Sequence, residues 1–232
     1  MNDRILVWDL PLRVFHWVLA ASFAGAFLTA ESERVRDLHL LFGYTFVAAI
    51  AFRLVWGFVG TRHARFSALR FGPGATRRYL LSLLRGRPER HLGHSPPGAV
   101  MIPLLLGLGL AVAASGWAVY ADAGGEWLEE AHEIAATVML VAVAGHVLGV
   151  VAVSVLQREN AVLALVTGRK RGAPGDGIRS ARPLAALLLL AALAGLWLPG
   201  IAARERRLAA RSSGASIAAA GEHAGVRAGR TD

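Results

Sequence analysis

The chain has 232 residues, of which 55% are hydrophobic, and a length that holds about four to six membrane-spanning helices in one domain. It contains no cysteine, which excludes disulfides, zinc–thiolate sites, iron–sulfur clusters and covalently attached haem. Its net charge of +9 comes from basic residues that flank apolar runs, so it indicates membrane topology and not nucleic-acid binding.

Five apolar runs are long enough, or nearly so, to cross a membrane: residues 14–30, 38–60, 99–121, 131–156 and 183–203. None alternates with a period of two over a barrel-length stretch. The sequence therefore predicts an all-α membrane protein, a four-helix transmembrane bundle with a fifth C-terminal transmembrane helix. The first run resembles a signal peptide, but Asp9 and Pro11 precede it and His16 and Trp17 interrupt it, so we expect an uncleaved helix.

Basic residues are distributed unequally among the loops. Residues 61–98 carry eight arginines and residues 157–182 carry six basic residues, whereas residues 122–130 carry four acidic residues and no basic one. The positive-inside rule then places the N-terminus and both basic loops in the cytoplasm, with the chain in a bacterial inner membrane. A fifth span would put Arg204 and the basic tail outside, against the same rule. We expect the tail, residues 204–232, to be disordered.

Four histidines lie inside or at the ends of the apolar runs: His16, His39, His132 and His146. Ionisable side chains are rare in membrane helices and usually functional. His132 and His146 are fourteen residues apart, about 21 Å along one helix and on nearly the same face. From the topology, His16 and His146 lie towards the cytoplasm, and His39 and His132 near the periplasm. The sequence predicts two depth-matched pairs, each able to hold one haem iron between two imidazoles.

Other interpretations remain open for single residues. A lone membrane histidine is as consistent with a hydrogen-bonded core side chain as with a ligand, and only the matched pairs favour ligands. Gly43 and Gly149, near His39 and His146, leave room for a porphyrin, although small residues are common at membrane helix interfaces. The remaining histidines fall in predicted loops and the tail, where we expect them to be solvated. They are His63, His91, His94 and His223.

Two arginines are candidates for binding haem propionates, which are carboxylates. Arg13 lies three residues before His16, and Arg53 lies towards the cytoplasmic end of the second run. The alternative for each is a side chain that extends to the membrane surface without a ligand.

The motifs together resemble the bacterial cytochrome b561 and nickel–iron hydrogenase b-type cytochrome family over residues 4–171. The first half carries Trp8-Asp9, Pro11, Arg13-x-x-His16-Trp17, His39-x-x-x-Gly43 and Arg53-x-x-Trp56-Gly57. The second half carries Gly93-His94-Ser95-Pro96-Pro97-Gly98, His132-Glu133, His146 and Thr167-Gly168-Arg169-Lys170-Arg171. Two positions depart from the family pattern: Ser95 stands where asparagine is usual and Pro97 where a hydrophobic residue is usual.

The resemblance implies a four-helix bundle with two non-covalently bound haem b groups, each with two histidine ligands. His16 with His146 would bind the cytoplasmic-side iron, and His39 with His132 the periplasmic-side iron. Members of this family pass electrons between the quinone pool and a redox partner. The expected partners are membrane lipid, a quinone, and a periplasmic cytochrome c or a dehydrogenase- or hydrogenase-type subunit, with no nucleic acid.

Two other functions compete with this one. The first is a stand-alone quinone-linked oxidoreductase, for example one that oxidises superoxide at the periplasmic haem. The second is a histidine-lined metal-ion transporter, which would need carboxylates beside the histidines, and the apolar runs hold almost none. We expect a di-haem domain over residues 1–171, a linker and extra helix over 172–203, and the tail beyond.

Overall fold

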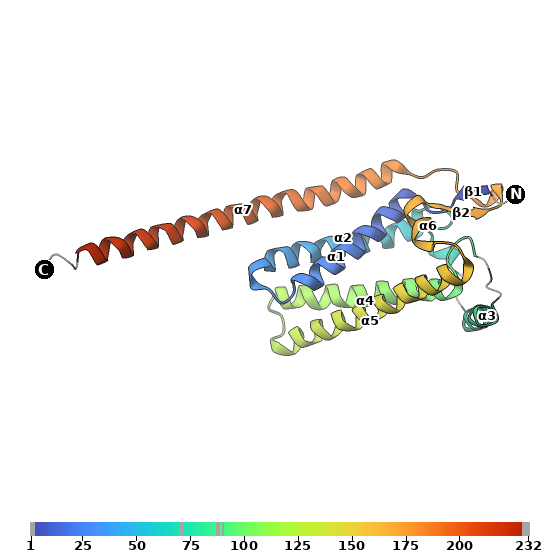
Figure 1. Ribbon diagram of the computed structural model, residues 1–232, viewed down its shortest axis with the longest axis horizontal. Helices are drawn as coiled ribbons and strands as arrows, with labels where there is room; N and C mark the ends of the chain where they lie inside the picture. Colours follow the sequence, from blue (N-terminus) through green and yellow to red (C-terminus); the bar gives the residue numbers. More distant parts are fainter. Residues whose placement is uncertain (1–2, 70–71, 87–88, 90, 229–232) are drawn as a thin grey trace.

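A computed structural model describes residues 3–69, 72–86, 89 and 91–228. This part of the chain forms seven α-helices and one two-stranded sheet (Figure 1). The sheet lies at one end of a bundle of long helices. We call this end of the bundle the sheet end and the opposite end the far end.

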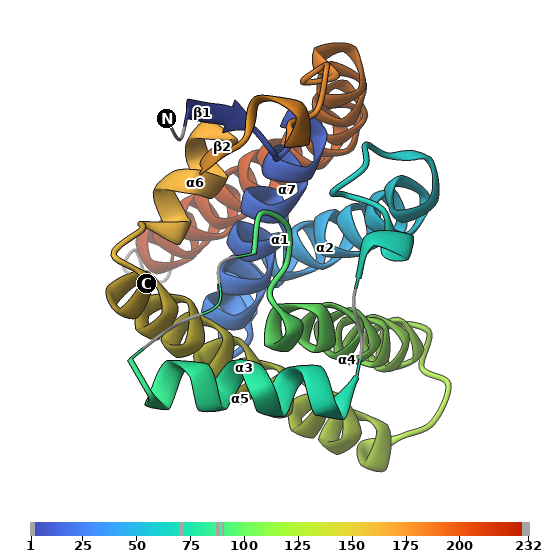
Figure 2. The same ribbon diagram turned by 90° about the vertical axis from the view of Figure 1, so that its right-hand side faces the viewer.

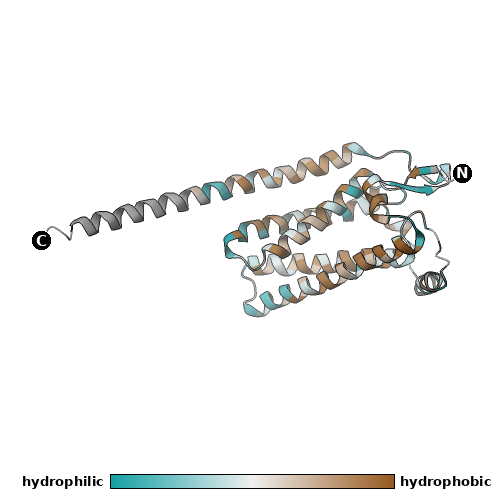
Figure 3. Ribbon diagram, viewed as in Figure 1, coloured by the Kyte–Doolittle hydropathy of each residue, from teal (hydrophilic) through white to brown (hydrophobic). Residues whose placement is uncertain are grey.

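Four long helices form the predicted bundle: α1 (Leu10–Thr29), α2 (Arg36–Val59), α4 (Pro96–Tyr120) and α5 (Glu126–Gln157). α1 packs against α2, and α4 packs against α5, with the two pairs side by side (Figures 1 and 2). All four are long and apolar enough to span a membrane. Figure 3 shows hydrophobic residues along most of the length of these helices and hydrophilic residues gathered at the far end. The chain is therefore a multi-pass membrane protein.

The ends of these helices follow from local sequence. Asp9 caps α1, because its Oδ1 accepts a hydrogen bond from the backbone N–H of Leu12 at 2.9 Å. Ser95 caps α4 in the same way, accepting from the backbone N–H of Gly98 at 3.4 Å. A proline follows within the first two positions of each helix, where the missing N–H costs nothing.

The predicted fifth spanning helix is present as α7 (Pro183–Ala228), which packs against α1 and α2. The indole Nε1 of Trp197 in α7 donates a hydrogen bond to Thr45 Oγ1 of α2 at 2.9 Å, and the indole ring packs edge-on against Phe42. Towards the far end, Arg207 forms an ion pair with Asp37 at 2.9 Å. The apolar span of α7 ends at Arg207, so a fifth transmembrane helix is part of the fold.

In the tail, the helix of α7 continues to Ala228, and residues 229–232 lie outside the described part. Disorder from residue 204 stays a prediction. The high alanine content of this segment favours a helix, since alanine has the strongest helix propensity of all residues. In Figure 1 this extension projects well past the far end of the bundle.

A small cap closes the sheet end, and nothing in the periodicity of the sequence indicated it. Strand β1 (Asp3–Leu6) pairs antiparallel with β2 (Arg169–Gly172), with Leu6 opposite Arg169. Helices α3 (Pro73–Leu84) and α6 (Ala161–Thr167) complete the cap, and α3 lies across the bundle axis (Figures 1 and 2). The cap joins the N-terminus to the segment between α5 and α7, because the backbone N–H of Ile178 donates to Leu6 O at 2.8 Å.

The buried core lies between the helix pairs. Phe46 and Ile50 of α2 pack with Leu106 of α4 and Met139 of α5, and each of these side chains is less than a tenth exposed. The outer faces of the helices stay apolar and exposed, as at Leu148, whose side chain is 69% exposed. Such faces are stable in lipid and not in water, which agrees with a membrane location.

Candidate functional site

The structure brings the four membrane histidines of three helices, α1, α2 and α5, together as two pairs. His16 of α1 faces His146 of α5 near the sheet end, and their ring centroids are 6.4 Å apart. His39 of α2 faces His132 of α5 near the far end, and their ring centroids are also 6.4 Å apart. We call these the sheet-end pair and the far-end pair. The pairing is the one expected from helix depth, whereas the role of the four residues as ligands remains a prediction.

The spacing of each pair suits a metal ion between two imidazoles. A metal lies about 2.0 Å from a coordinating imidazole nitrogen, and the ring centroid lies roughly 1.1 Å beyond that nitrogen, so two axial imidazoles have centroids about 6.2 Å apart. The two observed separations of 6.4 Å are close to this value. The described residues include no cluster of three or more histidine, cysteine or carboxylate side chains that could hold a metal ion.

The far-end pair is held in the tautomer that coordination needs. His39 Nδ1 lies 2.9 Å from the backbone carbonyl of Ala26, which only accepts, so Nδ1 carries the proton and Nε2 has a free lone pair. His132 Nδ1 lies 3.0 Å from Ser115 Oγ. Because that hydroxyl donates its own proton to the carbonyl of Ala111 at 2.8 Å, it accepts from His132. Both Nε2 atoms are left free to bind a metal.

The sheet-end pair lacks such support. His16 Nδ1 is buried and has no hydrogen-bond partner among the described residues, and the imidazole meets Trp17 edge to face with centroids 5.5 Å apart. A buried polar nitrogen without a hydrogen bond costs free energy unless a bound molecule supplies the missing contact.

Glycines leave space beside both histidine pairs. A Cβ on Gly116 of α4 would lie 2.8 Å from His132 Cε1, so this ring fits only because residue 116 has no side chain. A Cβ on Gly43, one turn after His39, would meet nothing within 4 Å. Gly149, beside His146, is equally open. The open space expected from the sequence near His39 and His146 is therefore present.

Three loop histidines that we expected to be solvated have defined partners. His94 packs on Trp8 with ring centroids 4.7 Å apart. Burial, together with the nearby charges of Arg53 and Lys170, lowers the pKa of His94 to about 3, so it is neutral. His63 Nε2 lies 3.0 Å from the carbonyl oxygen of Asp176, and His91 Nε2 lies 3.6 Å from a Glu89 carboxylate oxygen. The side chain of His223 lies outside the described residues.

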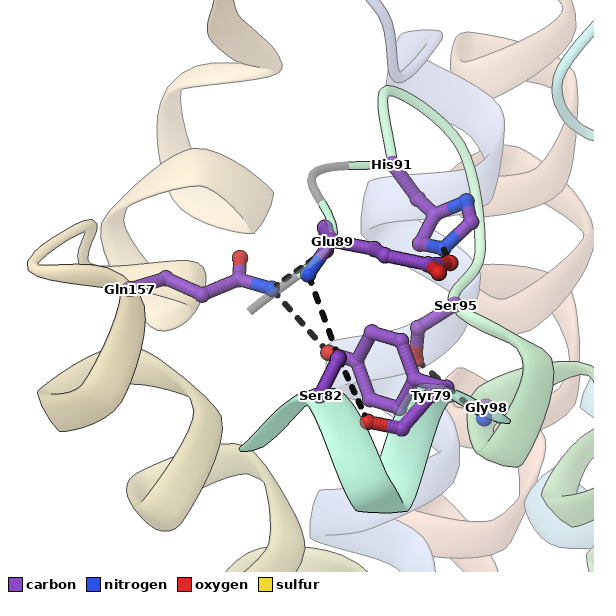
Figure 4. Close-up of polar contacts among 7 residues, drawn as sticks. All are labelled: Tyr79, Ser82, Glu89, His91, Ser95, Gly98 and Gln157. Atoms are coloured by element: carbon purple, nitrogen blue, oxygen red, sulfur yellow. Dashed lines mark hydrogen bonds and ion pairs between the residues drawn. The ribbon is translucent and has the colours of Figure 1, made fainter. Parts of the chain in front are cut away.

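A polar network fixes α3 against α4 and α5 at the sheet end (Figure 4). Tyr79 of α3 is fully buried, and its hydroxyl accepts from Gln157 Nε2 of α5 at 3.0 Å. Gln157 Nε2 also donates to the Glu89 carbonyl at 3.1 Å, and Ser82 Oγ donates to the Tyr79 carbonyl at 2.6 Å. Burial raises the pKa of Tyr79. Sequence reasoning missed these residues, which come from segments far apart in the chain.

The two candidate arginines differ in their surroundings. Arg13 donates from Nε to the carbonyl of Leu165 at 3.0 Å and from Nη2 to the carbonyl of Val166, at the end of α6. It therefore joins α1 to the cap, and binding a propionate remains a prediction for it. Arg53 does not extend to the surface, because it is only 2% exposed. Its Nη1 donates to the Ala64 carbonyl at 2.9 Å.

Comparison with known proteins identifies related sequences. The family model for prokaryotic cytochrome b561 matches residues 7–168. Similar curated proteins are described as probable Ni/Fe-hydrogenase B-type cytochrome subunits. The one from Rhodobacter capsulatus is 25% identical over 152 residues, covering 54% of this chain and 58% of that protein. The one from Azotobacter vinelandii is 28% identical over 149 residues, covering 52% of this chain and 61% of that protein.

A third relative, from Rhizobium leguminosarum bv. viciae, carries the same description and is 22% identical over 214 residues, covering 73% of this chain and 90% of that protein. The chain spans about three fifths of the length of the Rhodobacter and Azotobacter proteins. No solved structure matches the chain significantly.

Proposed function

This chain belongs to the prokaryotic cytochrome b561 family and is a membrane b-type cytochrome, and from that premise we propose that it carries electrons across the bilayer through two haem b groups. The observation that supports two haems is the pair of histidine sites, each with ring centroids 6.4 Å apart. His132 and His146 lie fourteen residues apart on α5, which separates the two sites by about 21 Å along the bundle.

The residues of this chain have simple tasks in the proposal. His16 and His146 would hold one iron, and His39 and His132 the other, leaving no coordination position open. A haem b held by two histidines would supply reversible one-electron chemistry. Ala26 O and Ser115 Oγ orient the far-end imidazoles so that each presents Nε2.

We propose an inner-membrane location with the sheet end in the cytoplasm. Both arginine-rich loops and the N-terminus lie at the sheet end, and the acidic residues at the start of α5 lie at the far end. The positive-inside rule supports this orientation. Arg204–Arg207 would then face the periplasm, and the ion pair of Arg207 with Asp37 reduces the cost of a positive charge there.

We propose that the electron partners are a quinone and a protein subunit at the periplasmic side. The relatives are described as hydrogenase cytochrome subunits, which favours a hydrogenase-type subunit over a cytochrome c or another dehydrogenase. The acidic side chains near the far end, including Glu130 and Glu133, are exposed and available to a partner.

The test is haem quantification with a reduced-minus-oxidised absorption spectrum of the detergent-purified protein. We expect two haem b per wild-type chain. His146→Ala should lose the sheet-end haem and keep the other, and His39→Ala should lose only the far-end haem. His63→Ala is the matched control outside both pairs and should keep two haems. A wild-type protein without haem, produced with ample haem supply, would overturn the proposal.

A further inference from the structure

Arg53 is a buried cation near the sheet end of α2. It is 2% exposed, lies on the face of α2 that also carries Phe46 and Ile50, and its guanidinium carbon lies 4.6 Å from the centre of the Phe66 ring. Arginine at such a position is rare and costly unless it binds a group of opposite charge. Arg53 therefore needs an anionic partner.

Within the described residues, no carboxylate lies within ion-pair distance of Arg53. Its Nη1 donates to the Ala64 carbonyl, but its Nη2 is buried and has no hydrogen-bond acceptor. The nearby carboxylate of Asp9 is occupied by other donors, because it accepts from the Leu12 backbone and from the side chains of Trp56 and Thr61. No ion pair joins Asp9 to Arg53 in this part of the chain.

Arg53 lies fourteen residues after His39 on α2, about 21 Å along the helix and therefore at the depth of the sheet-end histidine pair. His94 lies near Arg53, Lys170 and His146. Lys170 Nζ points into the protein, where it donates to the carbonyls of His91 and Gly93 at 3.3 and 3.4 Å. Two of its three ammonium protons are thus used by neutral acceptors, and neither contact neutralises its charge.

We propose that Arg53 binds a propionate carboxylate of the haem held by His16 and His146, with Lys170 as a second positive charge beside it. A guanidinium binds a carboxylate through parallel hydrogen bonds, which fits the unused Nη2 donor. A neutral quinone carbonyl would add no negative charge beside Arg53. This inference rests on the proposed haem function, and it gives α2 a role at the sheet-end site in addition to His39 at the far-end site.

The inference predicts an effect on the redox potential of one haem only. A fixed positive charge near the iron stabilises the reduced form, which carries one positive charge fewer. Arg53→Gln should therefore shift the reduction equilibrium of the sheet-end haem about tenfold towards the oxidised form, equivalent to about 59 mV for one electron. The far-end haem should keep its potential and serves as an internal control.

The experiment is a redox titration of the purified, haem-loaded protein, following the visible absorption band. His146→Ala identifies which of the two midpoints belongs to the sheet-end haem. Arg62→Gln, which removes an exposed arginine from the same end of the molecule, should leave both midpoints unchanged. Arg53→Lys keeps the charge and should recover more than half of the shift caused by Arg53→Gln.

A shift smaller than twofold in Arg53→Gln, or an equal shift in Arg62→Gln, would overturn the inference. If Arg53→Gln does not fold, Lys170→Gln provides the same test, with a smaller shift in the same direction expected and no shift overturning the inference. These outcomes differ from failure of the proposed function, which would appear first as a wild-type protein without two haems.

Discussion

The far-end and sheet-end histidine pairs have the same spacing but differ in what holds them. Both histidines of the far-end pair have a partner on Nδ1, the Ala26 carbonyl for His39 and the Ser115 hydroxyl for His132. At the sheet-end pair, His16 Nδ1 is buried without a partner among the described residues. The far-end imidazoles are thus oriented by other groups of the protein, whereas those residues provide no such contact to His16 Nδ1.

The largest effect that would separate the two sites is expected at Gly116. Gly116→Ala places a methyl group 2.8 Å from His132 Cε1, so the ring must leave its position opposite His39. We expect most of the far-end haem to be lost and the sheet-end haem to stay, measured as haem per chain. Gly107→Ala is the matched control on the same helix, because a Cβ there meets nothing within 4 Å. Equal haem loss in both variants would contradict this account.

A smaller effect is expected when only the orientation of His132 is disturbed. Ser115→Ala removes the acceptor for His132 Nδ1, and such outer partners commonly contribute about tenfold or more to metal affinity. We expect the far-end haem to dissociate about tenfold more readily in a competition assay with an apo haem-binding protein. The sheet-end haem has no equivalent support to lose, so its affinity should not change. Weaker haem binding at both sites would mean that Ser115 stabilises the whole bundle and does not act through the orientation of His132 alone.

The fifth helix should support the far-end half of the bundle by a modest amount. Trp197 Nε1 bonds to Thr45 Oγ1, two turns from His39 on α2. A double-mutant cycle with Trp197→Phe and Thr45→Val should give a coupling of about 0.6 kcal/mol, typical of hydrogen bonds between membrane helices. Thermal release of each haem, followed by its absorption, is the measurement. Additive effects of the two substitutions would show that the hydrogen bond contributes nothing.

The smallest effect concerns pH and the cap near the sheet-end pair. Because the pKa of His94 falls from its ordinary value of 6.5 to about 3 in the folded protein, the unfolded chain binds a proton between these values that the folded chain does not. Stability should therefore decrease as pH falls from 6.5 towards 3. In His94→Gln, which cannot titrate, thermal unfolding should depend less steeply on pH over this range. An unchanged pH dependence would show that the pKa of His94 does not differ between the folded and the unfolded protein.

Much of the membrane architecture could be predicted from the chain without coordinates. The five spans were located because runs of apolar residues of sufficient length have few alternatives to a transmembrane helix. The pairing of His16 with His146 and of His39 with His132 followed from helix direction and a rise of about 1.5 Å per residue. These inferences depend on periodicity and on the bilayer, and not on side-chain detail.

The cap at the sheet end could not be predicted in this way. Strands β1 and β2 are four residues each, and their pairing joins residues more than 160 positions apart. Short polar segments carry weak periodic signals, so His63, His91 and His94 were assigned to solvent. The tail was assigned to disorder for its composition, and this stays a prediction, although its alanine content favours the helix that the structure contains.

The sequence by itself determined the membrane class, the number of spans, the family and the four histidines, because each depends on hydrophobicity, length or motif spacing along the chain. Only the tertiary structure decided which polar atoms are satisfied. It provided the Ala26 and Ser115 partners of the far-end pair and left Arg53 Nη2 without an acceptor. Hydrogen bonds and buried charges depend on contacts between distant segments at distances of about 3 Å, which chain order does not specify.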